Sequence, residues 1–294
     1  MVVKTAYVTG GASGIGRAVV EMLGKRGVRV AVADVDLAGA KEAVSSLKDG
    51  VAVELDAASW DSQVAAFQKT LEEFGRMDYV FAIAGIGEKR WLENDAHSTG
   101  FVKPDLTTLD VDLNGVLYTA ALAIQQMRRQ EPDEREIRGK STSWSSLSNN
   151  ITQALTSAVP VTVVASVCGF YCVPTLPIYT AAKHGVVGFV RSYGKHLLTE
   201  AITLNAICPD VVRTSISTEA FYSKMEAKGL LVSMESVIQA FEQCLDDNIS
   251  GETLEIEPKS GVFLRSGPEP YDKEAEETLK MLHQRALHLQ QPSQ

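Results

Sequence analysis

The sequence lacks an excess of basic residues, and this absence narrows the classes of partner. Lys and Arg number 28 against 37 Asp and Glu, so the 294 residues carry a formal net charge of −9. The average field repels polyanions, and we therefore expect neither nucleic acid nor an anionic membrane surface as a partner. The sequence also has no long uncharged apolar span, and its start has no signal-like apolar segment with a cleavage site. We therefore expect a cytoplasmic protein.

Cysteine is scarce, and its spacing does not suit a metal site. Four cysteines are present, namely Cys168, Cys172, Cys208 and Cys244, with neither Cys-x-x-Cys spacing nor paired histidines nearby. Zinc sites use such clusters, so the sequence predicts no metal site. We expect the four as buried free thiols.

The sequence does contain a regular alternation of short β-branched runs with longer amphipathic stretches, which is typical of a parallel sheet covered by helices on both faces. Strands are predicted at residues 2–8, 28–33, 51–55, 79–83, 159–165, 202–207 and 253–256. Helices are predicted at residues 14–25, 37–47, 60–74, 109–129, 178–198 and 234–245. The predicted fold class is α/β, a single-domain doubly wound sheet, because 294 residues are within the range of one such domain.

Two segments interrupt this alternation. Residues 130–157 are first charged and then rich in Ser, Thr and Asn, which indicates a surface insertion. Residues 271–290 carry apolar side chains at three- and four-residue steps, so we expect a helix that packs on its own domain or on a sister subunit. The sequence therefore predicts a catalytic domain over residues 1–265 and a helical tail over residues 266–294.

A glycine cluster joins the first predicted strand to the first predicted helix. Glycines at such a junction let a pyrophosphate approach the N–H groups of the helix N-terminus, where the helix dipole favours negative charge. The flanking strands and helix also stand where a dinucleotide-binding unit needs them. Cofactor contacts are expected from Gly10, Ser13, Gly14, Ile15 and Gly16. A purely structural glycine turn is the alternative.

Two carboxylates follow the next two predicted strands. Asp34 lies about 20 residues beyond the glycines, where a carboxylate accepts hydrogen bonds from the adenosine ribose. The repulsion between this carboxylate and the 2′-phosphate of NADP would weaken binding by on the order of 4 kcal/mol per unit charge before screening. We therefore expect NAD rather than NADP. Arg17 or Arg29 at a phosphate would reverse this preference, and a solvent-facing Asp34 is the alternative. Asp56 is expected at the adenine edge.

Tyr179 and Lys183 stand four residues apart on a predicted helix, so their side chains project from one face. A surface pair is the default interpretation of such spacing. Ser166, which follows the fifth predicted strand, and the glycine cluster favour a functional pair instead.

These motifs together resemble the short-chain dehydrogenase/reductase family: Thr-Gly-Gly-Ala-Ser-Gly-Ile-Gly, Ser166 before Tyr-Thr-Ala-Ala-Lys, and Leu-Asn-Gly-Val, which contains Asn114. The resemblance covers residues 3–258. It implies a Rossmann-type fold, hydride transfer between NAD and a secondary alcohol or ketone, and homodimers or homotetramers through residues 109–129 and 178–198.

The resemblance also implies individual roles. Tyr179 would act as acid or base, Ser166 would hydrogen-bond the same oxygen, and Lys183 would bind the nicotinamide ribose. Asn114 would hold a water that links the lysine to solvent. A neighbouring ammonium stabilises a phenolate, so we expect Lys183 to lower the pKa of Tyr179.

The sequence departs from the family at two strand ends. The family reads Asn-Asn-Ala-Gly where this chain has Ala82-Ile83-Ala84-Gly85, and we expect Ala84 and Gly85 to keep the close approach to the ribose. The family reads Pro-Gly where this chain has Pro209-Asp210. Further cofactor contacts are expected from Pro209, Val212 and Thr214.

Residues 86–104 and 210–233 follow strand ends and are expected to form the substrate walls. Both carry bulky apolar side chains, namely Trp91, Phe101, Phe221, Tyr222, Met225, Leu230 and Leu231. These predict a lipophilic or cyclic alcohol or ketone as the substrate, unless the side chains only pack the loops down. A catalytically silent NAD-binding module and a redox-neutral enzyme on the same scaffold are the alternative functions.

Overall fold

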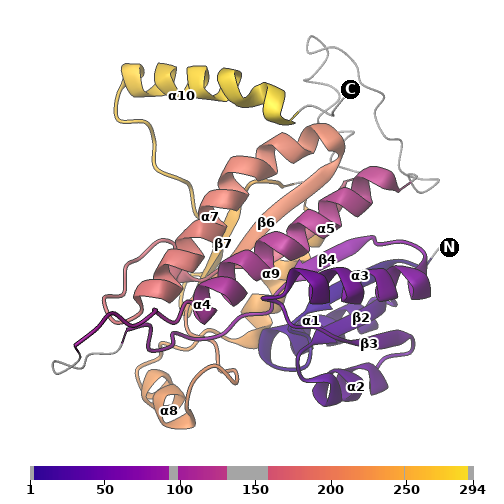
Figure 1. Ribbon diagram of the computed structural model, residues 1–294. Coiled ribbons are helices and arrows are strands. Elements are labelled where there is room, and N and C mark those ends of the chain that lie inside the picture. The colour runs from indigo at the N-terminus through magenta and orange to yellow at the C-terminus, as the bar shows by residue number, and fades with distance from the viewer. Residues whose placement is uncertain (1–2, 93–98, 131–157, 248, 291–294) are drawn as a thin grey trace.

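The computed structural model describes residues 3–92, 99–130, 158–247 and 249–290. Its centre is an eight-stranded sheet in the order β3-β2-β1-β4-β5-β6-β7-β8 (Figure 1). The strands are β1 (Thr5–Thr9), β2 (Arg29–Asp34), β3 (Gly50–Glu54), β4 (Tyr79–Ala82), β5 (Val159–Val164), β6 (Ile202–Pro209), β7 (Thr253–Glu257) and β8 (Gly261–Leu264). All neighbouring strands pair in parallel except β7 and β8, which form an antiparallel hairpin.

The predicted fold class is confirmed, and the seven predicted strands lie within a few residues of β1 to β7. Only the short β8 was not predicted. The strand order reverses direction between β1 and β4, and open α/β sheets bind ligands in the crevice beyond the strand ends at such a point.

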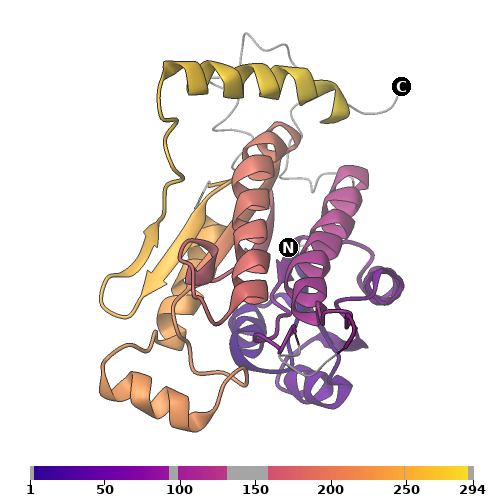
Figure 2. The same cartoon turned by 60° about the vertical axis from the view of Figure 1, so that its left-hand side comes forward.

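Helices cover both faces of the sheet (Figure 2). The α-helices are α1 (Gly14–Lys25), α2 (Leu37–Ser45), α3 (Trp60–Phe74), α4 (Thr107–Leu109), α5 (Val116–Arg129), α7 (Pro177–Leu197), α8 (Glu219–Ala227), α9 (Met234–Asp246) and α10 (Lys273–Ala286). The short helical turns are η1 (Asp110–Gly115), η3 (Val167–Gly169), η4 (Leu198–Glu200) and η5 (Leu287–Gln290). One buried cluster joins α3, α5 and α7 to the sheet, and a second joins α1, α2 and α9 to the other face.

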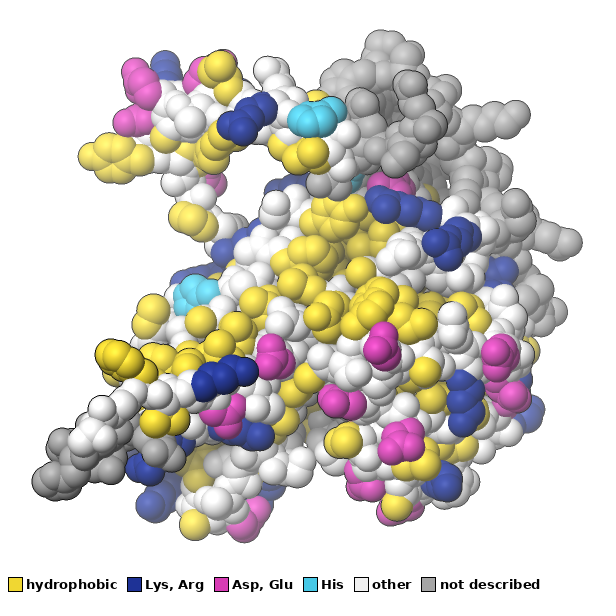
Figure 3. All heavy atoms as spheres, viewed as in Figure 1, with side chains coloured by type: hydrophobic (Ala, Val, Ile, Leu, Met, Phe, Trp, Pro, Cys, Tyr) yellow, Lys and Arg dark blue, Asp and Glu magenta, His cyan; other side chains and the backbone are white. Residues whose placement is uncertain are grey.

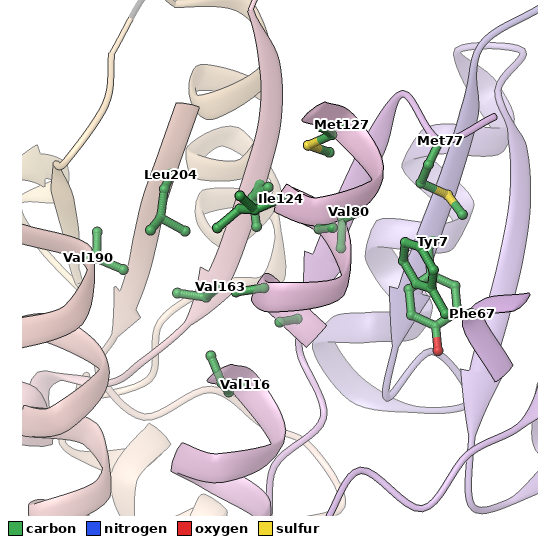
Figure 4. Packing of buried hydrophobic residues seen from close by; sticks show 14 of the residues in the cluster. Tyr7, Phe67, Met77, Val80, Val116, Ile124, Met127, Val163, Val190 and Leu204 are labelled. Atoms are coloured by element: carbon green, nitrogen blue, oxygen red, sulfur yellow. The ribbon is translucent and has the colours of Figure 1, made fainter. Parts of the chain in front are cut away.

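The first cluster is filled by aromatic and branched side chains (Figure 4). Tyr7 of β1 is fully buried and packs edge-on against Phe67 of α3, with ring centroids 5.2 Å apart. Val190 of α7 and Leu204 of β6 are also fully buried in this cluster. Because interiors are packed as densely as organic crystals, α7 is held firmly against the sheet.

The helix predicted at residues 109–129 is not continuous. A π-helical turn, η1, precedes α5 and adds one residue to the turn. Side chains compete for its backbone, because Gln63 Nε2 and Thr119 Oγ1 both donate to the Gly115 carbonyl at 3.0 Å. The prediction of one continuous α-helix is therefore wrong at its first turn.

The helix predicted at residues 271–290 corresponds to α10 and η5, which stand apart from the sheet (Figure 1). Leu279, Leu282 and Leu289 are each more than half exposed, so the apolar face of this helix does not pack on its own domain as one alternative predicted. Packing on a sister subunit and a domain boundary at residue 265 stay predictions.

The insertion predicted at residues 130–157 lies outside the described residues, apart from Gln130, whose side chain holds both backbone groups of Met77. Over the described ranges, the structure has no helix both long and apolar enough to cross a bilayer.

Candidate functional site

The glycine turn after β1 is packed tightly against the segment that follows β4. Gly10 has a φ of 70°, and a Cβ at this position would lie 2.7 Å from the Ala84 Cα. A Cβ on Gly16 would lie 2.0 Å from the carbonyl oxygen of Gly10. Side chains are therefore excluded at these two positions of the turn. Ser13 precedes α1 without capping it, so the first N–H groups of α1 are not bonded by its side chain.

Asp34 lies at the end of β2, beside this turn. Its Oδ2 accepts a hydrogen bond from the Ala12 N–H at 2.9 Å, and its Oδ1 accepts one from the Asp36 N–H at 3.0 Å. Asp56, beyond β3, is exposed and accepts from the Ala58 N–H. The structure thus brings Asp34 to the glycine turn, and it places Asp56 on the surface just after β3.

The two arginines that could have favoured a phosphate are both engaged with carboxylates. Arg17 forms ion pairs with Glu21 at 3.3 Å and with Glu42 at 3.6 Å. Arg29 Nε lies 2.7 Å from Asp49, and its guanidinium stacks over the Phe74 ring. Neither contact brings a positive charge to Asp34.

The segment after β4 keeps its close approach although it lacks the family's asparagines. Thr9 Oγ1 accepts hydrogen bonds from the N–H groups of Ile83 and Ala84 at 3.1 and 3.2 Å. A threonine hydroxyl on the neighbouring strand therefore holds this strand end, which places Gly85 beside Lys183.

Ser166, Tyr179 and Lys183 come together where β5 meets α7. Lys183 Nζ lies 5.2 Å from the centroid of the Tyr179 ring and donates to the Val164 carbonyl at 3.3 Å. A hydrogen bond with Ser166 stabilises the ionised form of Tyr179 and so tends to lower its pKa. Ser166 and Lys183 are almost fully buried. The predicted serine, tyrosine and lysine thus form one cluster.

The structure brings Asp112, not Asn114, to this cluster. Asp112 Oδ2 lies 2.9 Å from Lys183 Nζ, and the two side chains are 0% and 4% exposed. The other oxygen, Oδ1, accepts from the Ile86 N–H at 2.8 Å. The Asn114 amide instead donates to Asp110 at 3.0 Å, and its expected role, holding a water that links the lysine to solvent, stays a prediction. Residues two apart on a helix face different directions, so only one of the pair can point at Lys183.

A signal for Asp112 was present in the sequence. The buried face of α5 includes Val116, Ala120 and Ala123. One turn before Val116, the same helical face reaches Asp112, because residues four apart lie on one side. A carboxylate on an otherwise apolar stripe indicates a buried polar partner.

The pKa of Tyr179 is raised overall, although Lys183 acts on it in the expected, lowering direction. Burial is the main cause, and the carboxylate of Asp112 adds to it, whereas Lys183 and Ser166 act in the opposite direction. For Lys183, burial tends to lower the pKa, but Asp112 and Tyr179 outweigh it and raise the pKa above its usual value. The lysine is therefore an ammonium, and its field at the phenol is opposed by a carboxylate.

Glu88 is a further residue of the site that the sequence did not reveal. Its Oε2 accepts from the Tyr179 N–H at 2.6 Å, and its Oε1 accepts from the Ile178 N–H at 3.3 Å. A carboxylate is favourable at the N-terminus of α7, where the helix dipole is positive. Glu88 thereby fastens the loop after β4 to the helix that carries Tyr179, across 91 positions of sequence.

The same loop is fixed at two more points. The hydroxyl of Thr108 donates to the Gly87 carbonyl at 3.1 Å and accepts from the Lys89 N–H at 3.3 Å. Farther along, the Asp105 N–H donates to the Trp91 carbonyl at 3.0 Å. The backbone hydrogen bond between Asp105 and Trp91 thus joins the two ends of this stretch of chain.

The second predicted wall, residues 210–233, folds over the glycine turn. A Cβ on Gly14 would lie 3.2 Å from Thr214, and the hydroxyls of Ser13 and Ser215 are 3.3 Å apart. Tyr222 is 3% exposed and accepts from the Ser217 N–H, so it packs the loop down rather than lining a wall. Phe221 is 40% exposed and keeps an apolar surface available.

The end of β6 carries the other departure. The Asp210 N–H donates to the Ile256 carbonyl at 3.0 Å, so the backbone path after Pro209 is fixed without the glycine of the family. Burial raises the pKa of the Asp210 carboxyl, and Glu257 adds to this. Val212 follows in a short bridge with Val232.

The cysteines agree with expectation except at one position. Cys168, Cys208 and Cys244 are buried free thiols, whereas Cys172 is exposed. Among the residues that the structure describes, no group of three or more His, Cys, Asp or Glu could hold a metal ion.

A comparison with protein families decides the assignment. The family described as short chain dehydrogenase matches residues 4–139 and 141–224. The chain belongs to the short-chain dehydrogenase family. It is thereby an oxidoreductase of the group that uses a dinucleotide cofactor on alcohols and carbonyl compounds.

Three relatives illustrate the range of this family. The short-chain dehydrogenase/reductase prx7 of Penicillium rubens is 34% identical over 188 residues, 62% of this chain, which spans 58% of that protein. Human 15-hydroxyprostaglandin dehydrogenase [NAD(+)] is 29% identical over 72% of this chain and 70% of its own length. The NADP-dependent dehydrogenase M3 of a Phoma species is 33% identical over 85% of this chain and 74% of its own.

A solved structure shares the fold. The 3-ketoacyl-(acyl-carrier-protein) reductase of Brucella melitensis, complexed with NADH, superposes with a TM-score of 0.68. It covers 88% of this chain and 98% of its own at 21% identity. This likeness concerns the fold alone.

Proposed function

We propose that the chain is an NAD-dependent oxidoreductase that interconverts a secondary alcohol and a ketone, with a lipophilic or cyclic substrate. The observation that carries this proposal is the cluster of Ser166, Tyr179 and Lys183 beside the glycine turn. Acid–base catalysis needs such a group within reach of the reacting oxygen, and the hydroxyls of Ser166 and Tyr179 meet at one point.

The residues around the glycine turn fit a dinucleotide. Gly10 and Gly16 leave no side chain in the turn, and the uncapped N-terminus of α1 suits a pyrophosphate. Asp34 supports NAD over NADP because a carboxylate repels a 2′-phosphate, and the pairing of Arg17 and Arg29 with other carboxylates leaves that repulsion in force. Contacts to the rest of the cofactor are assigned to Ile15, Asp56, Ala84, Pro209, Val212 and Thr214.

The proposed mechanism gives each side chain one task. The nicotinamide, when bound, supplies or accepts the hydride. In the reductive direction Tyr179 donates its hydroxyl proton to the carbonyl oxygen while Ser166 hydrogen-bonds the same oxygen and stabilises the charge that develops there. In the oxidative direction the phenolate of Tyr179 removes the hydroxyl proton. Lys183 stabilises that phenolate and would hold the ribose of the cofactor.

The proposed assembly is a homodimer or homotetramer through α5 and α7. Figure 3 shows a broad group of apolar side chains over these two helices. Phe189 and Tyr193 of α7 pack together at 5.9 Å between ring centroids and remain partly exposed. A cytoplasmic location stays a prediction.

The test is a fluorescence titration with NADH and with NADPH, followed by a panel of small polar and bulky ring alcohols monitored by nicotinamide absorbance. Tighter binding of NADH together with faster turnover of the ring alcohols supports the proposal. Preferred binding of NADPH contradicts the role of Asp34, and faster turnover of the small polar alcohols contradicts the substrate class. Binding without any turnover favours a catalytically silent module.

A further inference from the structure

Asp112 is a buried carboxylate in direct contact with the proposed catalytic cluster. Its side chain is fully buried in η1, 2.9 Å from Lys183 Nζ, and the Ile86 N–H fixes its second oxygen at 2.8 Å. A Cβ on Gly85 would lie 3.4 Å from Asp112 Oδ2 and 3.6 Å from Lys183 Nζ. The ion pair therefore lies directly against Gly85, where the cofactor ribose is expected, and neither partner reaches bulk water.

The groups that face Tyr179 differ in charge. Lys183, on the same helix, is positive, and Asp112, on η1, is negative. Ser166 at the end of β5 contributes a neutral hydroxyl, and Cys168 on η3 contributes a thiol whose pKa is raised, mainly by burial. From β6, Cys208 faces Lys183 with a pKa raised by burial. Glu88 contacts the backbone N–H of Tyr179 rather than its phenol.

We propose that Asp112 is a positioning residue that anchors Lys183 against Gly85 and offsets its positive charge, so that Tyr179 is held as a neutral phenol at neutral pH. A neutral phenol is the proton donor for carbonyl reduction, whereas alcohol oxidation needs the phenolate. The site is therefore set for reduction near neutrality, and oxidation becomes efficient only as the pH rises. This inference rests on the proposed role of Tyr179, but its test does not require a substrate.

The decisive measurement is a spectroscopic titration of Tyr179 in the full chain. The near-ultraviolet absorbance of tyrosinate is followed against pH, and the curve of Tyr179→Phe in the same background is subtracted to isolate this phenol. In the unaltered protein we expect a midpoint above the usual value of about 10. A midpoint below that value would overturn the proposal without any change to Asp112.

Asp112→Asn removes the charge and keeps an oxygen for the Ile86 N–H. The Asp112 charge acts to raise the pKa of Tyr179, and a nearby charge typically shifts a pKa by about one to three units, so we expect the Tyr179 midpoint to fall by about one pH unit. An unchanged or higher midpoint overturns the proposal. Asp110→Asn is the matched control: it makes the same chemical change in the same turn, on a carboxylate that contacts Asn114, and should leave the midpoint unchanged.

Two further measurements separate this inference from the proposed function. Asp112→Ser also removes the charge and replaces Asp112→Asn if that variant does not fold. Where a substrate has been found, the pH profile of kcat/KM for oxidation should move to lower pH by the same amount as the phenol midpoint. If NADH does not bind or no alcohol is turned over, the proposed function fails, yet the phenol titration still decides the role of Asp112.

Discussion

The cofactor side and the substrate side of the site are built by different kinds of contact. On the cofactor side, the glycine turn and Asp34 are neighbours through a short stretch of sequence, and Ala12 and Asp34 are only 22 positions apart. On the substrate side, Glu88 holds Tyr179 across 91 positions. Local spacing therefore determines the first region, whereas the second exists only once the sheet has formed. The following variants test this contrast.

Tyr179→Phe should have the largest effect. It removes the only proton that the proposed mechanism moves, so we expect turnover to fall by about 10²- to 10⁴-fold while NADH binding stays nearly unchanged. Tyr193→Phe, farther along the same helix, is the control and should retain activity. Steady-state kinetics with a fluorescence titration provide the measurement, and near-native turnover of Tyr179→Phe would refute its role as acid or base.

Asp34→Ser should change cofactor preference. The lost repulsion is on the order of 4 kcal/mol per unit charge before screening, so we expect the ratio of NADH to NADPH affinity to fall at least about tenfold. Asp36→Ser is the control, because it removes a neighbouring carboxylate but keeps a side-chain oxygen that can cap α2 at the Gly39 N–H, and it should leave the ratio unchanged. Equal ratios in Asp34→Ser and the unaltered protein would exclude Asp34 from cofactor choice.

Gly10→Ala should weaken both stability and NADH binding. Its φ of 70° strains an alanine by about 1–2 kcal/mol, and the new Cβ would also press on the Ala84 Cα. Gly27→Ala is a matched control, because Gly27 has a φ of 74° and nothing within 4 Å of a Cβ. Both variants should lower Tm, and only Gly10→Ala should also weaken NADH binding. Equal losses of Tm with unchanged binding would mean that the close approach to Ala84 has no effect.

Glu88→Gln should have the smallest effect of the four. It keeps one of the two oxygens that accept from the Ile178 and Tyr179 N–H groups, and it removes the charge at the N-terminus of α7, which stabilises the helix by about 0.3–1 kcal/mol. We expect a decrease of a few degrees in Tm and a modest loss of kcat. Glu72→Gln, on the exposed side of α3, should change neither. A Tm as high as that of the unaltered protein would show that the contact does not stabilise α7.

The sequence predicted those parts of the fold that depend on period and local spacing. Seven strands and the face shared by Tyr179 and Lys183 follow from apolar alternation and from the helical repeat. The contact between Asp112 and Lys183 was not predicted, because the motif Leu-Asn-Gly-Val singles out Asn114 and not the residue that continues the buried stripe of α5. The π-helical turn has no comparable local signature, since it is fixed by Gln63 from α3.

Neither the burial of Tyr222 nor the exposure of α10 could be predicted. The sequence shows that an aromatic residue in a loop or an apolar stripe on a helix favours burial, but it does not show which surface the side chains pack against. Tyr222 finds its partners at Thr214 and Ser217 within its own loop. Leu279, Leu282 and Leu289 of α10 and η5 remain more than half exposed in the part of the chain that the structure describes.

The anchoring of the loop after β4 also has a practical consequence for protein engineering. Glu88 and Thr108 secure its first residues, and the contact between Trp91 and Asp105 closes its far end. A library randomised at residues 99–103 therefore varies the predicted substrate wall, while the contacts that hold the helix carrying Tyr179 stay in place. Selection on such a library can change the substrate specificity without first having to recover lost stability.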